Sequence, residues 1–181
     1  MIGRTRVSHR PSLRALASLA GVLACFGGAG CVIINDPSPS DTTTIDGPPR
    51  DQFDDLGLLM GKRCGTLDCH GQVGRNLRIY SQDGLRLSTA DVPGGRPTTT
   101  AELDADYESA IALEPEIMSQ VVKDGGKNPD RLTLVRKPRL EEHHKGGQLF
   151  VIGDPQDLCM TSWLASNIDT ANCTLAIKTY P

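Results

Sequence analysis

Aromatic residues are scarce in this chain of 181 residues, which has three Phe, three Tyr and one Trp. Apolar stretches are short as well: the run Ala15–Phe26 has twelve residues, whereas a membrane-spanning helix needs about 20. Basic residues are not in excess, since 19 Lys and Arg stand against 22 Asp and Glu. These shortages exclude a multispanning membrane protein and argue against binding of nucleic acid through bulk charge.

Sequence signatures of several enzyme classes are also absent. No G-x-x-x-x-G-K-S/T, G-x-S-x-G or H-E-x-x-H motif occurs. The acidic residues Asp104, Asp106 and Glu108 lack the longer oxygen-rich spacing of a calcium loop, and we expect them on a solvated helix face. We therefore assign no catalytic residue from the sequence.

The first thirty residues have the organisation of a bacterial export signal. Four arginines precede the apolar run, namely Arg4, Arg6, Arg10 and Arg14. The segment Gly28-Ala29-Gly30-Cys31 that follows resembles a lipoprotein lipobox, in which the cysteine becomes the lipidated first residue of the mature chain. A rival box ends at Cys25 inside the apolar run, and an ordinary signal peptide with an incidental cysteine is the alternative.

Cleavage before Cys31 would leave an acidic mature chain, with 15 basic and 22 acidic side chains and a net charge of −7. Such a chain would be held at the membrane by its lipid rather than by surface charge. Residues 31–52 are rich in Asp, Pro, Ser and Thr, which predicts a disordered tether after the lipidated cysteine. The expected location is the cell envelope, anchored to a bacterial membrane and facing the periplasm or the cell surface.

Residues 53–181 are predicted to form one mainly α domain with long loops. Apolar periodicity and end signals favour helices over 52–63, 99–113, 116–123 and 154–166. Thr99 and Glu102 form a capping-box pattern, and Asp154-Pro155 is a good N-cap and first-turn pair. A hairpin or a short helix is expected within 75–87, and a loop over 91–98.

Cysteine and histidine concentrate in one short motif, Cys64-x-x-x-x-Cys69-His70. An exported chain normally oxidises its cysteines, and the shortest pairing would join Cys64 to Cys69 and Cys159 to Cys173. The competing interpretation is a haem attachment site, whose usual form is C-x-x-C-H. Here two additional residues separate the cysteines and would have to bulge outward.

Adjacent cysteine and histidine suit haem better than zinc. Neighbouring side chains diverge, so Cys69 and His70 close poorly on one small tetrahedral ion. A haem spreads its attachment points, because thiols bond the ring edge while the histidine binds the iron. Apolar residues upstream could pack on the porphyrin face: Phe53, Leu56, Leu59 and Met60.

The helix leading into Cys64…Cys69-His70-Gly71 resembles the cytochrome c-like haem domains of exported bacterial proteins. A second match lies downstream. This part of the chain is similar to the S-x-L-x-R-K-P…H-x-G-G…W-L/I tail of that group. The matching residues are, in order, Leu132–Pro138, His144-Lys145-Gly146-Gly147, Phe150 and Trp163-Leu164. The resemblance implies a small helical fold with haem c, with His70 as proximal ligand and Cys64 and Cys69 as thioether cysteines.

The second axial ligand of such a haem would be His or Met. His144 is the first candidate because Gly146-Gly147 would let the backbone come close; neighbouring His143 would point elsewhere. Met118 and Met160 are alternatives, although core packing is the commoner role of helix methionines. Cys159 and Cys173 are expected to form a disulfide that pins the end of the last predicted helix to the C-terminal segment.

Two functions follow from these patterns. The first is a lipid-anchored haem protein that passes single electrons to a redox partner protein, without enzymatic activity. The second is a disulfide-stapled surface lipoprotein that acts as a cofactor-free binding or structural module. A redox-active dithiol at Cys64 and Cys69 is a weaker third, because exchange sites usually have two residues between the cysteines.

Overall fold

The computed structural model describes residues 45–179. The predicted signal peptide, the lipidation site Cys31 and the tether as far as residue 44 lie outside these described residues. No helix within 45–179 has both the length and the apolar character required to cross a membrane.

The described chain is helical, which confirms the prediction of a mainly α domain. Six α-helices follow in order: α1 (Asp54–Arg63), α2 (Thr100–Ile111), α3 (Pro115–Lys123), α4 (Thr133–Arg139), α5 (Pro155–Leu164) and α6 (Thr170–Lys178). Two single turns of 3-10 helix, η2 (Arg50–Gln52) and η3 (Pro129–Arg131), complete the regular structure. Between residues 45 and 179 there is no β-sheet, only isolated bridges at Thr66–Gly84 and Tyr80–Leu85.

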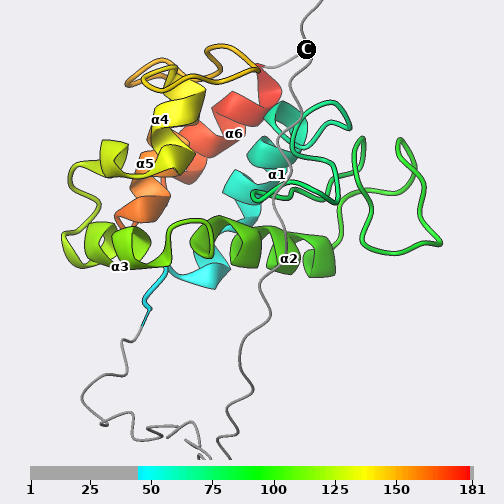
Figure 1. Ribbon diagram of the computed structural model, residues 1–181, viewed down its shortest axis with the longest axis horizontal. Helices are drawn as coiled ribbons and strands as arrows, with labels where there is room; N and C mark the ends of the chain where they lie inside the picture. The colour runs from blue at the N-terminus through cyan, green and yellow to red at the C-terminus, as the bar shows by residue number, and fades with distance from the viewer. Residues whose placement is uncertain (1–44, 180–181) are drawn as a thin grey trace, which may run out of the picture. The chain divides into compact units, whose positions relative to one another are not determined.

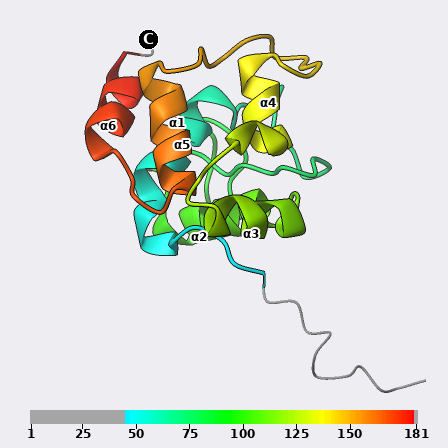
Figure 2. The same ribbon diagram turned by 90° about the vertical axis from the view of Figure 1, so that its left-hand side faces the viewer.

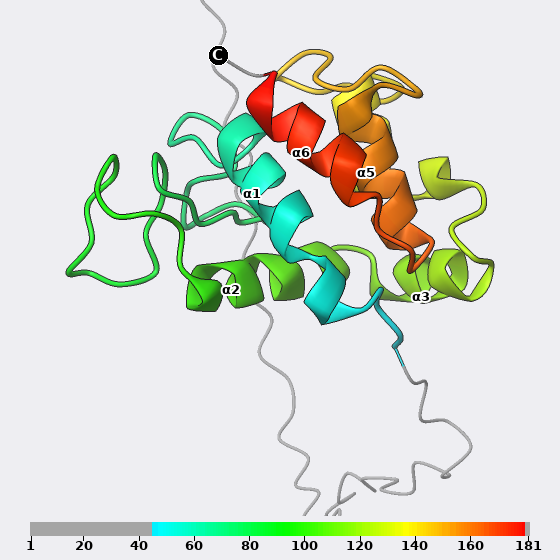
Figure 3. The ribbon, with the colours of Figure 1, turned by 180° about the vertical axis from the view of Figure 1, so that it is seen from behind.

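The helices enclose one core. Helices α2 and α3 run one after the other beneath the remaining elements, as Figure 1 shows. Helix α5 lies between α4 and α6 (Figure 2), and α1 lies beside α6 when the molecule is seen from behind (Figure 3). The long segment 64–99 between α1 and α2 has no helix and forms the loops that project on one side.

Local end signals explain where several helices begin. The Thr99 side chain accepts from the Glu102 backbone N–H, and the Glu102 carboxylate accepts from the Thr99 N–H, so the predicted capping box is formed. The Asp154 carboxylate caps α5 by accepting from the Asp157 N–H. Helix α1 starts two residues later than predicted, because Arg50–Gln52 forms the separate turn η2.

Other elements differ from the sequence prediction. Residues 75–87 form neither a hairpin nor a helix, because side chains of other segments take up their backbone groups. The Arg78 N–H donates to Ser109 Oγ at 2.8 Å, and the Tyr80 N–H donates to Asp106 Oδ1 at 2.7 Å. Helix α6 was not predicted, although the Asp169 side chain caps it by accepting from Asn172 N–H.

The last part of the predicted tether belongs to the folded domain. Pro48 is buried, and its carbonyl accepts a hydrogen bond from the Tyr107 hydroxyl at 2.9 Å. Gln52 bonds the loop between α5 and α6, donating to the Ser166 carbonyl and accepting from the Ile168 N–H. A composition rich in Pro and Gly does not exclude order where such contacts hold the backbone, so the domain begins before residue 53.

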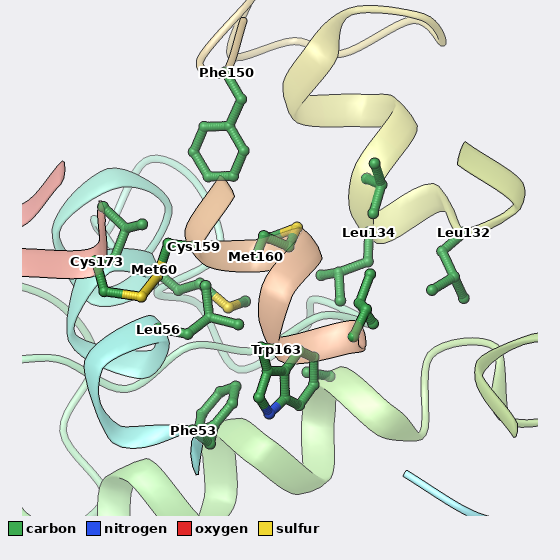
Figure 4. Close-up of a cluster of buried hydrophobic side chains, with 14 of the residues drawn as sticks. Phe53, Leu56, Met60, Leu132, Leu134, Phe150, Cys159, Met160, Trp163 and Cys173 are labelled. Atoms are coloured by element: carbon green, nitrogen blue, oxygen red, sulfur yellow. A yellow bond between two sulfur atoms is a disulfide. The ribbon is translucent and has the colours of Figure 1, made fainter. Parts of the chain in front are cut away.

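Trp163 on α5 lies at the centre of the core, where it is fully buried (Figure 4). Its ring centre is 5.2 Å from that of Phe53 and 6.3 Å from that of Tyr107. The expected disulfide joins Cys159 to Cys173 and so fastens α5 to α6. Leu158 of the same helix points away from this core and is 38% exposed.

Asp106 was expected on a solvated face of α2, but it is fully buried. Its Oδ1 accepts from the Tyr80 N–H, while its Oδ2 has no hydrogen-bond partner among the described residues. Burial raises the pKa of Asp106 to about 8, and the nearby Glu102 carboxylate adds to the rise. At neutral pH the group is therefore mostly protonated.

A raised carboxyl pKa makes stability depend on pH. Between about pH 4 and pH 8 the folded chain keeps a proton on Asp106 that the unfolded chain has lost, so stability falls as the pH rises through this window. We expect Asp106→Asn, which preserves the acceptor for Tyr80, to show a smaller fall in the free energy of unfolding between these pH values. Urea unfolding at several pH values measures that fall. Glu108→Gln, which removes an exposed carboxylate of α2, is the control. Parallel pH profiles for Asp106→Asn and the parent chain would contradict the account.

Candidate functional site

The Cys64…His70 motif forms a closed loop at the end of α1. The His70 N–H donates to the Cys64 carbonyl at 2.9 Å, and the N–H groups of Cys69 and Gly71 both donate to the Thr66 carbonyl. The four residues between the cysteines therefore fold outward as one turn. Cys64 and His70 are joined at the base of that turn by this backbone hydrogen bond.

Glycine is required at Gly71 because two backbone segments touch there. A Cβ atom added at Gly71 would collide with the carbonyl oxygen of Gly65, and one added at Gly84 would collide with the same oxygen. Neither glycine has a positive φ, so the requirement is close approach rather than backbone conformation.

His144 lies in a second closed loop, which follows α4. The N–H groups of Leu149 and Phe150 both donate to the Pro138 carbonyl and so close the loop. Within it, the Gly147 N–H donates to the His144 carbonyl, and Gly147 adopts a φ of 74°, which favours glycine. The guanidinium of Arg63, the last residue of α1, donates to the Leu149 carbonyl at 3.0 Å and so bonds the end of α1 to this second loop.

The two histidines have the same hydrogen-bonding state. Nδ1 of His70 lies 2.9 Å from the Leu77 carbonyl, and Nδ1 of His144 lies 2.9 Å from the Gly147 carbonyl. Because a carbonyl can only accept, Nδ1 of each ring carries a proton, which leaves Nε2 as the nitrogen that could offer a lone pair to a metal. This arrangement fixes the tautomer and orientation of a histidine that binds metal through Nε2.

The rings of His70 and His144 face the same space. Their centres lie 6.3 Å apart, and their planes are inclined by 24°. If each histidine bound one shared ion through a bond of about 2 Å, the two ring centres would lie roughly 6 Å apart, because the radius of each ring adds to the bond length. The structure thus brings together the two histidines that the sequence proposed as axial ligands.

Burial lowers the pKa of His70, and the positive charges of Arg75 and Lys137 add to this effect together with His144. The hydrogen bond to the Leu77 carbonyl opposes it. The neutral imidazole is therefore favoured at neutral pH, and the neutral form is the one that binds a metal.

Cys64 and Cys69 are free thiols in the structure, so the expected local disulfide between them is not formed. Burial raises the pKa of the Cys64 thiol to about 12, which keeps its sulfur uncharged.

Two cavities meet at the histidines. The inner one has a volume of about 420 Å³ and is lined by Cys64, both histidines and apolar side chains that include Met60, Leu134, Phe150 and Met160. The outer one, of about 610 Å³, is lined by Cys69, both histidines and charged side chains. Both volumes fall within the usual range for small-molecule and cofactor sites.

The other predicted site residues divide into two groups. Met160 lines the inner cavity, and exposed His143 lines the outer one. Met118 is fully buried on α3 and lines neither of these two cavities, so the structure does not bring it to the histidines. Of the four apolar residues expected to pack on a porphyrin, Met60 alone lines either cavity.

Sequence reasoning missed three groups at the site. The Leu77 and Gly147 carbonyls that orient the histidines are backbone atoms, and no side-chain pattern indicates them. Arg75, which lines both cavities, follows His70 by five residues but belongs to no recognised spacing. Within residues 45–179, no cluster of three or more His, Cys, Asp or Glu side chains is placed to hold a metal ion.

Comparison of the chain with protein-family models, with curated proteins and with solved structures gave no significant match.

The glycine contact can be tested by substitution. Gly71→Ala should destabilise the fold by about 1–3 kcal/mol, because the added methyl forces the Gly65 backbone away. Gly74→Ala is the matched control, since an added Cβ there meets nothing within 4 Å. Chemical unfolding of both variants measures the difference, and equal stabilities would contradict the close approach.

Proposed function

We propose that the chain is an exported haem protein that carries single electrons, with haem c held between His70 and His144. The observation that carries the proposal is the pairing of two imidazoles whose centres are 6.3 Å apart, each with its Nδ1 proton on a backbone carbonyl. Two protein ligands suffice for this cofactor, because the porphyrin itself supplies four nitrogen ligands to the iron.

The remaining side chains of the site are compatible with a haem. Cys64 and Cys69, one lining each cavity, would bond the ring edge as thioethers. Met60, Leu134, Phe150 and Met160 offer apolar surface for the porphyrin face. The Leu77 and Gly147 carbonyls accept from Nδ1 of the two histidines, which leaves Nε2 of each ring as the nitrogen that could bind a metal.

Bound haem supplies an iron that gains or loses one electron at a time. If His70 and His144 both bound the iron, no ligand position would remain for a substrate. This arrangement supports electron transfer to a redox partner protein rather than catalysis. Membrane attachment through lipidated Cys31, at the cell envelope, belongs to the same proposal and rests on the sequence of the export segment.

Substitution of the second axial ligand tests the proposal, because His143 provides a matched neighbour. The full chain should be produced in a periplasm equipped for haem attachment, and its absorption spectrum recorded in both oxidation states. We expect His144→Ala to convert a six-coordinate, low-spin spectrum into a high-spin one, and His143→Ala to leave the spectrum unchanged.

An unchanged spectrum in His144→Ala would contradict this ligand assignment and would transfer it to Met160, which also lines the inner cavity. A colourless parent chain, with no haem absorption, would instead contradict the haem proposal as a whole.

A further inference from the structure

The surroundings of the histidine pair are basic, although the domain is acidic. Residues 45–179 contain 15 basic and 20 acidic side chains, which gives a net charge of −5. The outer cavity is nevertheless lined by Arg75, Lys137 and Lys145, with Asp68 as its single carboxylate, and the inner cavity has Arg75 and Lys137 with no carboxylate. Arg75 and Lys145 are exposed and Lys137 is half-buried, so together they give the cavities a basic rim that an anionic ligand would complement.

Arg75 is positioned but not neutralised. Its Nε donates to the Cys69 carbonyl at 2.9 Å, which holds the side chain beside the motif. Among the described residues, its two terminal nitrogens make no hydrogen bond and no ion pair. A guanidinium with both terminal groups available is suited to bind a carboxylate in bidentate fashion.

Lys137 on α4 is the second cation that lines both cavities. Its Nζ lies 2.7 Å from the Glu142 carboxylate, but Glu142 also pairs with Arg136 at 3.1 Å. Glu142 therefore keeps a basic partner when Lys137 turns toward a ligand. Lys137, Arg75 and His70 all line both cavities, so the two cations and the imidazole border the same space.

The neighbouring arginines of α4 have other partners. Arg139 forms two hydrogen bonds to the buried Asp157 carboxylate, at 2.7 and 3.0 Å. Arg136 bonds Glu142 and the backbone carbonyls of Asp130 and Arg131. Lys137 is thus the one basic residue among Arg136, Lys137 and Arg139 that lines the cavities.

We propose that Arg75 and Lys137 bind the carboxylates of the porphyrin, an inference that rests on the proposed haem function. Haem carries two propionate groups on an otherwise apolar ring, so its charge and its apolar area match the two kinds of lining in these cavities. Arg75 would take one carboxylate through its terminal nitrogens, and Lys137 would act on the other as a point charge.

The test compares two probes that differ only in these carboxylates. Iron mesoporphyrin IX has ethyl groups in place of vinyls and cannot react with Cys64 or Cys69, and its dimethyl ester lacks the negative charges. Both are titrated into the full chain produced without haem and kept reduced at those thiols. We expect the diacid to bind roughly tenfold more tightly than the ester.

The double variant Arg75→Gln/Lys137→Gln should lose this preference by weakening the diacid alone. The control Lys62→Gln/Arg96→Gln removes the same charge from exposed positions that line neither cavity, and it should keep the preference. Equal affinity of the parent chain for diacid and ester would overturn the carboxylate assignment while leaving the haem proposal in place. Binding of neither probe, with no low-spin spectrum, would contradict both.

Discussion

The candidate site depends on one kind of interaction, the hydrogen bond from an imidazole Nδ1 to a backbone carbonyl. It occurs at His70 with Leu77 and at His144 with Gly147, both at 2.9 Å. Each bond fixes the tautomer and leaves Nε2 as the nitrogen available to a ligand, and the two closed loops set the ring centres 6.3 Å apart. Without these bonds the histidines would be two polar side chains on loops, with no defined direction for a ligand.

Buried ion pairs and a disulfide hold the loops and helices around this pair. The Arg86 guanidinium bonds the Glu102 carboxylate at 2.8 and 3.0 Å and so fastens the long segment 64–99 to the start of α2. Arg139 and Asp157 tie α4 to α5 in the same way, while Cys159–Cys173 joins α5 to α6. A domain with few aromatic residues thus relies on paired charges and a covalent bond in addition to its core.

Local sequence signals predicted much of this fold and part of the candidate site. The capping box at Thr99 and the Asp154-Pro155 pair predicted the starts of α2 and α5. The pair Gly146-Gly147 made His144 the first candidate for a partner of His70. The features that were not predicted depend on contacts between residues far apart in the sequence. Asp106 lies four residues after Glu102, and both side chains are on the buried face of α2. Acidic side chains on a helix predict an exposed face, and neighbouring residues give no sign of the contact between Asp106 and Tyr80. Residues 75–87 stay irregular for the same reason, since their partners lie on α2.

The intact mass of the denatured mature chain, purified from a periplasm with haem-attachment machinery, tests the central claim most directly. The account predicts a mass raised by one haem and a Soret band that persists after unfolding, with peptide mapping that locates the haem on Cys64 and Cys69. A colourless chain without added mass, in which Cys64 and Cys69 are joined to each other, would contradict it.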